Sequence, residues 1–159
     1  ERTEINLASI IAEVIEDLEI IITDKKADIR IGKLPAIKAS KVQIRQLFGN
    51  LITNAIKYSK ETVAPLIEIY QAENLNVEMP NQNAKFVKIQ IKDNGIGMES
   101  SHLLKIFTIF QRLHARNEYS GNGIGLAICK KIMENHSGNI TVESTLNEGT
   151  TFNLYFPIL

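Results

Sequence analysis

The sequence predicts an α+β fold, a two-layer α/β sandwich in which about three helices cover one face of one mixed, mostly antiparallel sheet. Two amphipathic helical patterns dominate the N-terminal part, and a third lies nearer to the C-terminus. Most strand patterns occur in pairs that hairpin turns can join. Because 159 residues are the length of one ordinary domain, we expect residues 1–159 to form a single unit.

Charge and cysteine content limit the classes of protein to consider. Lys plus Arg and Asp plus Glu each total 18, so we expect no nucleic acid partner and no membrane contact by this domain. One cysteine, Cys129, excludes an intrachain disulfide and favours a reducing, cytoplasmic compartment. The apolar stretch from Ile10 to Ile22 is interrupted by acids, so it is not a membrane span. Any anchor of a larger parent protein is expected outside this sequence.

The N-terminal half predicts two helices separated by a short strand. Residues 7–22 have apolar side chains at helical spacing with acids opposite. Residues 27–31 alternate as in a strand, and Leu34-Pro35 indicates a turn. A second helix is predicted from Ser40 as N-cap to about Tyr58. Its expected buried residues are Ile44, Leu47, Phe48, Leu51, Ile52 and Ala55.

The C-terminal half predicts two pairs of strands around a third helix. Residues 66–70 and 86–91 show strand patterns, and the Asn-rich segment 74–84 is predicted to be the loop between them. A short helical segment follows up to Phe107. Residues 139–144 and 150–156 predict the closing hairpin. The third helix, which begins in the glycine cluster at 121–125, is expected to bury Leu126, Ile128, Cys129, Ile132 and Met133.

Three polar motifs are candidates for a ligand site. Asn50 and Asn54, one turn apart on the second helix, offer amide oxygens that suit Mg²⁺; such a pair is also typical of an exposed polar stripe. Asp93 opens Asp-Asn-Gly-Ile-Gly-Met at a strand end, where its carboxylate can accept from the amine of a base, although an ordinary turn has the same composition. Gly121-Asn122-Gly123-Ile124-Gly125 precedes a helix, so its amides can face phosphate oxygens; a flexible loop is the alternative.

The order of these motifs resembles the GHKL ATP-binding superfamily, which includes gyrase, the heat-shock chaperone, histidine kinases and the MutL mismatch-repair protein. Residues 50–58 match its N box, 93–98 its first glycine box and 121–126 its second. Phe107-Thr108-Ile109-Phe110 matches the F box of histidine kinases, and Glu148-Gly149-Thr150 matches a turn near the end of that domain. The resemblance implies the Bergerat fold and covers nearly the whole chain.

The resemblance also implies a role for each motif, with ATP and Mg²⁺ as the bound cofactors. Asn54 is the expected Mg²⁺ ligand, supported by Asn50, while Lys57 would contact a phosphate and Tyr58 the adenine. Asp93 would accept from the adenine amine. Arg112 and Arg116, in an ATP lid between Phe110 and Gly121, would meet the γ-phosphate. The remaining expected ATP-binding residues are Gly95, Gly97, Met98, Phe107, Phe110, Gly121, Gly123, Gly125, Leu126 and Thr150.

Within the superfamily, Asn50 favours a kinase. Gyrase-like and mismatch-repair-like ATPases have a Glu at this place to activate water, and an amide cannot take that proton. The sequence therefore resembles the catalytic domain of a sensor histidine kinase, and residues 106–125 resemble the lids of phytochrome-like or multi-sensor kinases. Neither His102, His114 nor His136 is followed by an acid, as a phosphoacceptor histidine usually is, so each is predicted to be a surface or structural residue.

The resemblance implies that the partner is a histidine-containing dimerisation domain of the same parent protein. This acceptor domain and the sensor are expected before Glu1, and a response regulator is expected to act downstream. Two alternatives remain open from the sequence. One is a protein serine kinase of the anti-sigma type, and the other is a nucleotide-binding module that regulates a partner without catalysis. The F box and the long C-terminal hairpin favour the histidine kinase.

Overall fold

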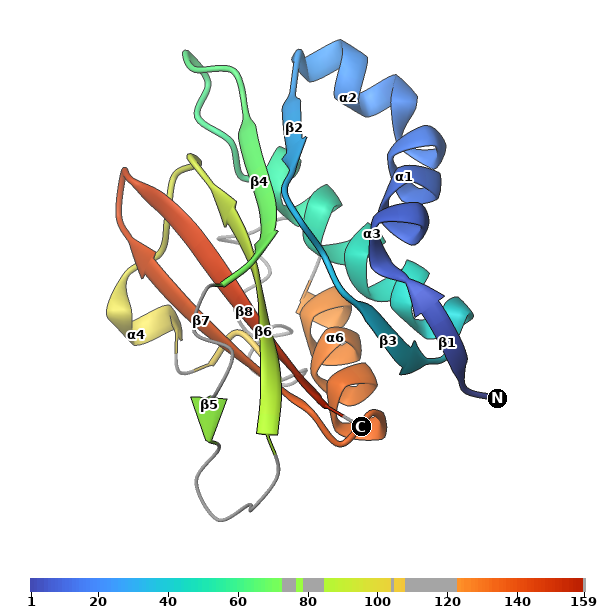
Figure 1. The fold of residues 1–159 in the computed structure, drawn as a ribbon. Helices are drawn as coiled ribbons and strands as arrows, with labels where there is room; N and C mark the ends of the chain where they lie inside the picture. The colour runs from blue at the N-terminus through green and yellow to red at the C-terminus, as the bar shows by residue number, and fades with distance from the viewer. Residues whose placement is uncertain (73–76, 79–84, 104, 108–122, 159) are drawn as a thin grey trace.

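A computed structural model describes residues 1–72, 77–78, 85–103, 105–107 and 123–158. Its main sheet has the strand order β2-β4-β6-β8-β7, with the short β5 paired to the start of β6. Among the strands that the structure describes, only β2 and β4 pair in parallel, and the remaining neighbours are antiparallel. The predicted mixed, mostly antiparallel sheet is therefore confirmed (Figure 1). The strands are β2 (Asp28–Ile31), β4 (Leu66–Gln71), β5 (Val77–Glu78), β6 (Lys85–Asp93), β7 (Asn139–Thr145) and β8 (Gly149–Pro157).

Three long helices form the second layer, as the sequence predicted. They are α1 (Leu7–Asp17), α3 (Lys41–Lys57) and α6 (Gly123–Asn135), and Figure 1 shows them together on one side of the main sheet. Their apolar faces and alternate side chains of the strands form one core cluster. Burial of this apolar surface is the main stabilising contribution. The short helix α4 (Ser100–Leu103) lies beside β7.

Three short strands were not predicted from the sequence. Strands β1 (Thr3–Asn6) and β3 (Ala36–Ala39) form a separate antiparallel pair in which Ile5 opposes Ile37. Each strand has four residues, which is too short for alternation to stand out. Strand β5 lies inside the segment 74–84 that was expected to be loop only.

The prediction of one continuous helix over residues 7–22 is wrong. It ends at Asp17, and α2 (Glu19–Lys25) begins after Leu18, whose φ of −100° and ψ of 13° interrupt the helix. The Leu18 N–H bonds the carbonyls of both Val14 and Ile15, a shared pattern typical of helix ends. Beyond the break, Ile20 is 84% exposed, whereas Ile21 and Ile22 still pack against the core as partly buried residues.

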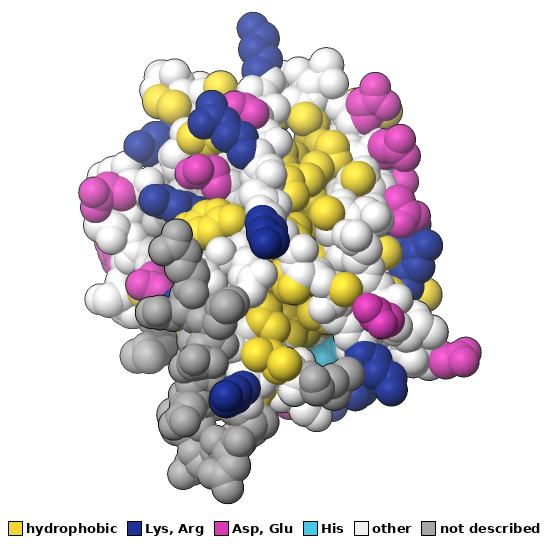
Figure 2. Space-filling model, viewed as in Figure 1, with side chains coloured by type: hydrophobic (Ala, Val, Ile, Leu, Met, Phe, Trp, Pro, Cys, Tyr) yellow, Lys and Arg dark blue, Asp and Glu magenta, His cyan; other side chains and the backbone are white. Residues whose placement is uncertain are grey.

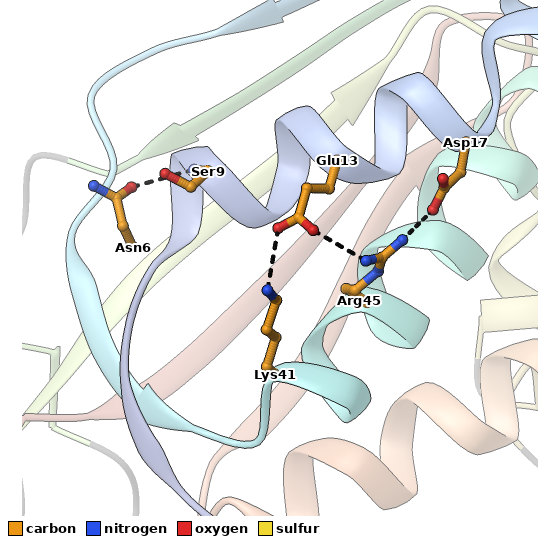
Figure 3. Close-up of polar contacts among 6 residues, drawn as sticks. All are labelled: Asn6, Ser9, Glu13, Asp17, Lys41 and Arg45. Carbon is orange, nitrogen blue, oxygen red and sulfur yellow. Dashed lines mark hydrogen bonds and ion pairs between the residues drawn. The ribbon is translucent and has the colours of Figure 1, made fainter.

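Helix α3 agrees with its prediction, because Ser40 caps it by accepting from the Gln43 N–H at 3.3 Å. Charged side chains connect it to α1, as Figure 3 shows. Glu13 contacts Lys41 at 3.6 Å and Arg45 at 3.1 Å, and Arg45 also contacts Asp17. These pairs are partly exposed, so each contributes little to stability. They lie between α1 and the helix that carries Asn50 and Asn54.

A buried histidine connects α3 to α6. The Nε2 atom of His136, which is 5% exposed, accepts from the Ser40 N–H at 3.0 Å. Its Nδ1 lies 2.8 Å from the Ile132 carbonyl, so the neutral ring with hydrogen on Nδ1 satisfies both contacts. His136 is therefore structural, one of the two roles predicted for it.

The surface carries no dominant charge on the face that Figure 2 shows. Basic and acidic side chains are interspersed there, and hydrophobic side chains reach the surface between the main sheet and the side of α1. None of the helices in the described part of the chain combines the length and the apolar content that a bilayer crossing requires.

Candidate functional site

Polar side chains replace the apolar core at one end of the main sheet. On β6 and β8, Ile91 opposes Phe152, and both are buried against the helices. Side chains two residues apart point to the same face, so Asp93 and Thr150 continue this row. Ser144 of β7 pairs with Thr150 and completes it. The row faces the helical layer at the point where β6 ends.

The carboxyl group of Asp93 is held by two backbone N–H groups. Its Oδ1 accepts from Gly95 at 2.8 Å and from Thr150 at 3.3 Å. Burial raises the pKa of Asp93 from 3.8 to about 6, and the two hydrogen bonds oppose that rise. Within the described part of the chain, its other oxygen, Oδ2, has no hydrogen bond. That oxygen is a partly buried acceptor, which fits a donor group on a ligand.

The first glycine box lies between α3 and the C-terminal hairpin. The Ile96 N–H donates to the Tyr58 carbonyl at 2.9 Å, and a Cβ at Gly95 would lie 2.5 Å from that carbonyl oxygen. Gly97 has a φ of +70°, and a Cβ there would lie 2.1 Å from the Thr145 carbonyl oxygen. Only glycine permits either approach. The prediction concerned a close approach of this backbone to a base, and the packing against Tyr58 and Thr145 was not predicted.

Asn94 has a structural role that the sequence did not reveal. Its Oδ1 accepts from the Leu66 N–H at 2.8 Å, and its Nδ2 donates to the Ala64 carbonyl at 3.2 Å. The amide thereby connects the glycine box to the start of β4. Asn is common in turns for its own local hydrogen bonds, so the sequence offered no signal for this distant pair.

Helices α3 and α6 meet at the predicted N box. The Nδ2 of Asn50 donates to the Gly125 carbonyl at 3.3 Å, in the first turn of α6. The Cys129 thiol donates to the Leu47 carbonyl at 3.9 Å, and burial raises the pKa of this thiol to about 12, an effect that the nearby Asn50 side chain opposes. Cys129 is fully buried in the core, as predicted. Asn50, the first metal candidate, therefore lies next to the second glycine box.

Asn54 is the second metal candidate on α3. It is half-buried, and within the described residues its side chain makes no hydrogen bond, so its amide oxygen is available. One turn further, the exposed Lys57 places its Nζ 5.7 Å from the centroid of the Tyr58 ring. Asn50 and Tyr58 are separated by about 12 Å along the helix axis. The predicted N box thus extends from the start of α6 to the first glycine box.

Some of the other predicted site residues lie in the described part of the chain, and the rest lie outside it. Phe107 contacts the edge of Phe152, with ring centroids 6.3 Å apart, and Leu126 is buried in the core cluster. Met98 donates its N–H to Ser144. Gly123 begins α6, as expected of a helix that opens in the second glycine box. The predictions for Phe110, Arg112, Arg116, Gly121 and His114 lie outside the described residues.

The raised pKa of Asp93 predicts a titration that depends on nucleotide. Because the folded pKa lies above the usual value, this carboxyl contributes stability that is complete below pH 3.8 and lost as pH rises through about 6. A donor on Oδ2 favours the ionised form, so bound adenine nucleotide is expected to lower the pKa. The carboxyl ¹³C signal followed by NMR with and without saturating ADP checks this, and an identical midpoint in both titrations would contradict it.

The fold and the sequence together define the class of protein. Residues 39–159 match the family described as histidine kinase-, DNA gyrase B-, and HSP90-like ATPase, and the chain belongs to that family. Within it, the chain is a GHKL catalytic ATP-binding domain, homologous to phytochrome-like and other sensor histidine kinases.

Relatives from cyanobacteria show the sequence similarity. The phytochrome-like protein Cph1 of Synechocystis is 39% identical over 158 residues, which are 99% of this chain and 20% of that protein. Cyanobacterial phytochrome A of Nostoc is 47% identical over 137 residues, covering 86% of this chain and 17% of that protein. The chain therefore spans about a fifth of the length of these relatives.

A solved structure shows the same fold. The catalytic domain of histidine kinase ThkA superposes with a TM-score of 0.74 at 27% identity, covering 99% of this chain and 95% of that one. The mycobacterial sensor histidine kinase MprB has a TM-score of 0.77 at 18% identity, with 99% and 97% covered, and this likeness concerns the fold alone.

Proposed function

We propose that this domain binds ATP with Mg²⁺ and donates the γ-phosphoryl group to a histidine on a separate dimerisation domain. The proposal rests on membership of the family and on the arrangement of the described motifs. Asp93 offers a partly buried acceptor at the sheet end, and the start of α6 lies beside Asn50. An adenine at the first position and a triphosphate at the second fit these two chemistries.

Each residue of this site has a proposed task. Asp93 accepts from the adenine amine, and Tyr58 contacts the base, with Gly95 and Gly97 allowing the backbone to approach. Asn54 is the proposed Mg²⁺ ligand, and Mg²⁺ when bound neutralises charge on the phosphates. Asn50, whose Nδ2 is committed to Gly125, offers its oxygen to the metal or to its water. Lys57 is proposed to contact a phosphate. The lid residues Arg112 and Arg116 keep their expected γ-phosphate contact as part of the proposal.

The amide at Asn50 is the observation that favours a kinase over an ATP hydrolase. It lies one turn before the proposed metal ligand and donates to the Gly125 carbonyl. An amide cannot remove a proton from water, so the site has no general base there. Transfer to a histidine needs none in this domain, because positioning and charge neutralisation lower the barrier. The acceptor nitrogen forms its bond to phosphorus as the bond to ADP breaks.

The test is phosphotransfer to the acceptor domain of the parent protein. The 159-residue chain, radiolabelled ATP, Mg²⁺ and that purified domain are expected to give a label that is labile to acid and stable to base, which is the behaviour of phosphohistidine. An acid-stable label would support a serine kinase instead. Tight ATP binding without any transfer would support the regulatory module.

A further inference from the structure

Ser144 lies at the end of the polar row, and neither the sequence motifs nor the proposed function assigns it a role. Its hydroxyl oxygen has three partners at hydrogen-bond distance. The Met98 N–H donates to it at 2.8 Å, the Gly149 carbonyl lies 2.9 Å away, and the Thr150 hydroxyl lies 2.8 Å away. Ser144 therefore connects the first glycine box to the turn between β7 and β8.

The hydrogen bonds of the Ser144 hydroxyl determine whether the neighbouring Thr150 hydroxyl donates or accepts. A serine hydroxyl has one hydrogen and two lone pairs. The Gly149 carbonyl only accepts, so it takes the single hydrogen of Ser144. Met98 fills one lone pair, and the Thr150 hydroxyl must therefore donate its own hydrogen to the other. Thr150 is then left with lone pairs only.

This polarity matters because Thr150 lies beside the base-reading carboxylate. Its backbone N–H donates to Asp93 Oδ1 at 3.3 Å, and its side chain is on the same face of the sheet as Asp93. Thr150 is 7% exposed, so its hydroxyl exchanges little with bulk water. Asp93 Oδ2 and the Thr150 hydroxyl oxygen are thus two acceptors on the same face of the sheet, and neither has a hydrogen to offer.

We propose that Ser144 is a positioning residue that makes this site selective for a purine with a 6-amino group over one with a 6-oxo group. The inference deepens the proposed function and rests on it. A 6-amino group or its bridging water donates to the two acceptors. A 6-oxo group meets only lone pairs there, and a polar group left without a partner weakens binding.

The test compares ATP with inosine triphosphate, which carries the 6-oxo group and the same phosphates. Without the Ser144 hydroxyl, the Thr150 hydrogen is free to turn toward a 6-oxo group. Calorimetry on Ser144→Ala is expected to show an ATP preference reduced by about tenfold, which corresponds to one lost hydrogen-bond contribution. Ser144→Thr keeps the hydroxyl and is expected to retain the preference of the unchanged protein.

Thr141→Ala is the matched control, because Thr141 is on the same strand and accepts from Asn153 at 3.2 Å, away from Asp93. It is expected to keep the preference. Equal losses of ATP and inosine triphosphate affinity in Ser144→Ala would show a merely structural role and overturn the inference. An unchanged preference would also overturn it. If the unchanged protein binds neither nucleotide, the proposed function itself fails. If it binds ATP but the preference does not depend on Ser144, only the inference about Ser144 fails.

Discussion

Asp93→Asn is expected to abolish nucleotide binding, with a loss of about 100-fold or more in ATP affinity. The new amide oxygen still accepts from the N–H groups of Gly95 and Thr150. Its NH₂ then occupies the place of Oδ2 and meets the adenine amine, so donor faces donor. The lost charge-assisted bond and the unsatisfied donors together correspond to roughly 3–6 kcal/mol. Titration calorimetry with ATP measures the change directly.

The fold is expected to survive this substitution. Burial already makes the charged form of Asp93 unfavourable, as its pKa of about 6 indicates, so a neutral amide removes that cost at neutral pH. We therefore expect no lower Tm. The amide can donate to a 6-oxo group, so inosine triphosphate is expected to lose less affinity than ATP. Asp28→Asn, at an exposed position paired to Arg30, is the control and should leave affinity unchanged. Undiminished ATP affinity in Asp93→Asn would remove Asp93 from the base site.

Asn54→Ala is expected to impair Mg²⁺-dependent phosphotransfer far more than nucleotide binding without metal. Loss of a supporting residue near a metal commonly costs 10- to 100-fold, and loss of a direct ligand should reach about 100-fold or more. Binding of ATP in EDTA is expected to change by less than about threefold, because no phosphate contact is assigned to this amide. Transfer rates with Mg²⁺ and affinities with and without it measure the two effects.

The position tolerates this test, since alanine is the best helix former and Asn54 makes no side-chain hydrogen bond within the described residues. Gln46→Ala, at an exposed position two turns earlier on α3, serves as the control and should affect neither assay. Equal losses in the transfer assay and in metal-free binding would mean that Asn54 contacts the nucleotide or the fold, and not the metal.

Long periodic patterns carried most of the fold prediction. Helix α3, the alternation of β6 and the closing hairpin follow from the sequence, because each buries one face of many residues. The break at Leu18 did not, because nothing in the local sequence stops the helix. After the break Ile20 is exposed, while Ile21 and Ile22 still pack against the core. Strands β1 and β3 depend on pairing with each other although α1, α2 and β2 lie between them in sequence, which periodicity cannot show.

The candidate site could be predicted where a motif carries its own geometry. Gly123 begins a helix, as the second box implied, whereas the positive φ of Gly97 became visible only in the structure. Ser144 and Asn94 could not be predicted, because their contacts join segments far apart in sequence and each residue is ordinary in its local setting. Asn50 could be recognised as a metal candidate from the sequence. Its hydrogen bond to Gly125 could not, because that bond depends on the packing of α3 on α6.

The central claim is that Asp93, Asn54 and the start of α6 belong to one site for ATP and magnesium. A crystal structure of the chain with a non-hydrolysable ATP analogue and Mg²⁺ tests it most directly. We predict the adenine amine within hydrogen-bond distance of Asp93 Oδ2, the metal on the Asn54 oxygen, and the phosphates at the N-terminus of α6. A nucleotide bound elsewhere, or a metal without Asn54 in its coordination shell, would contradict the claim.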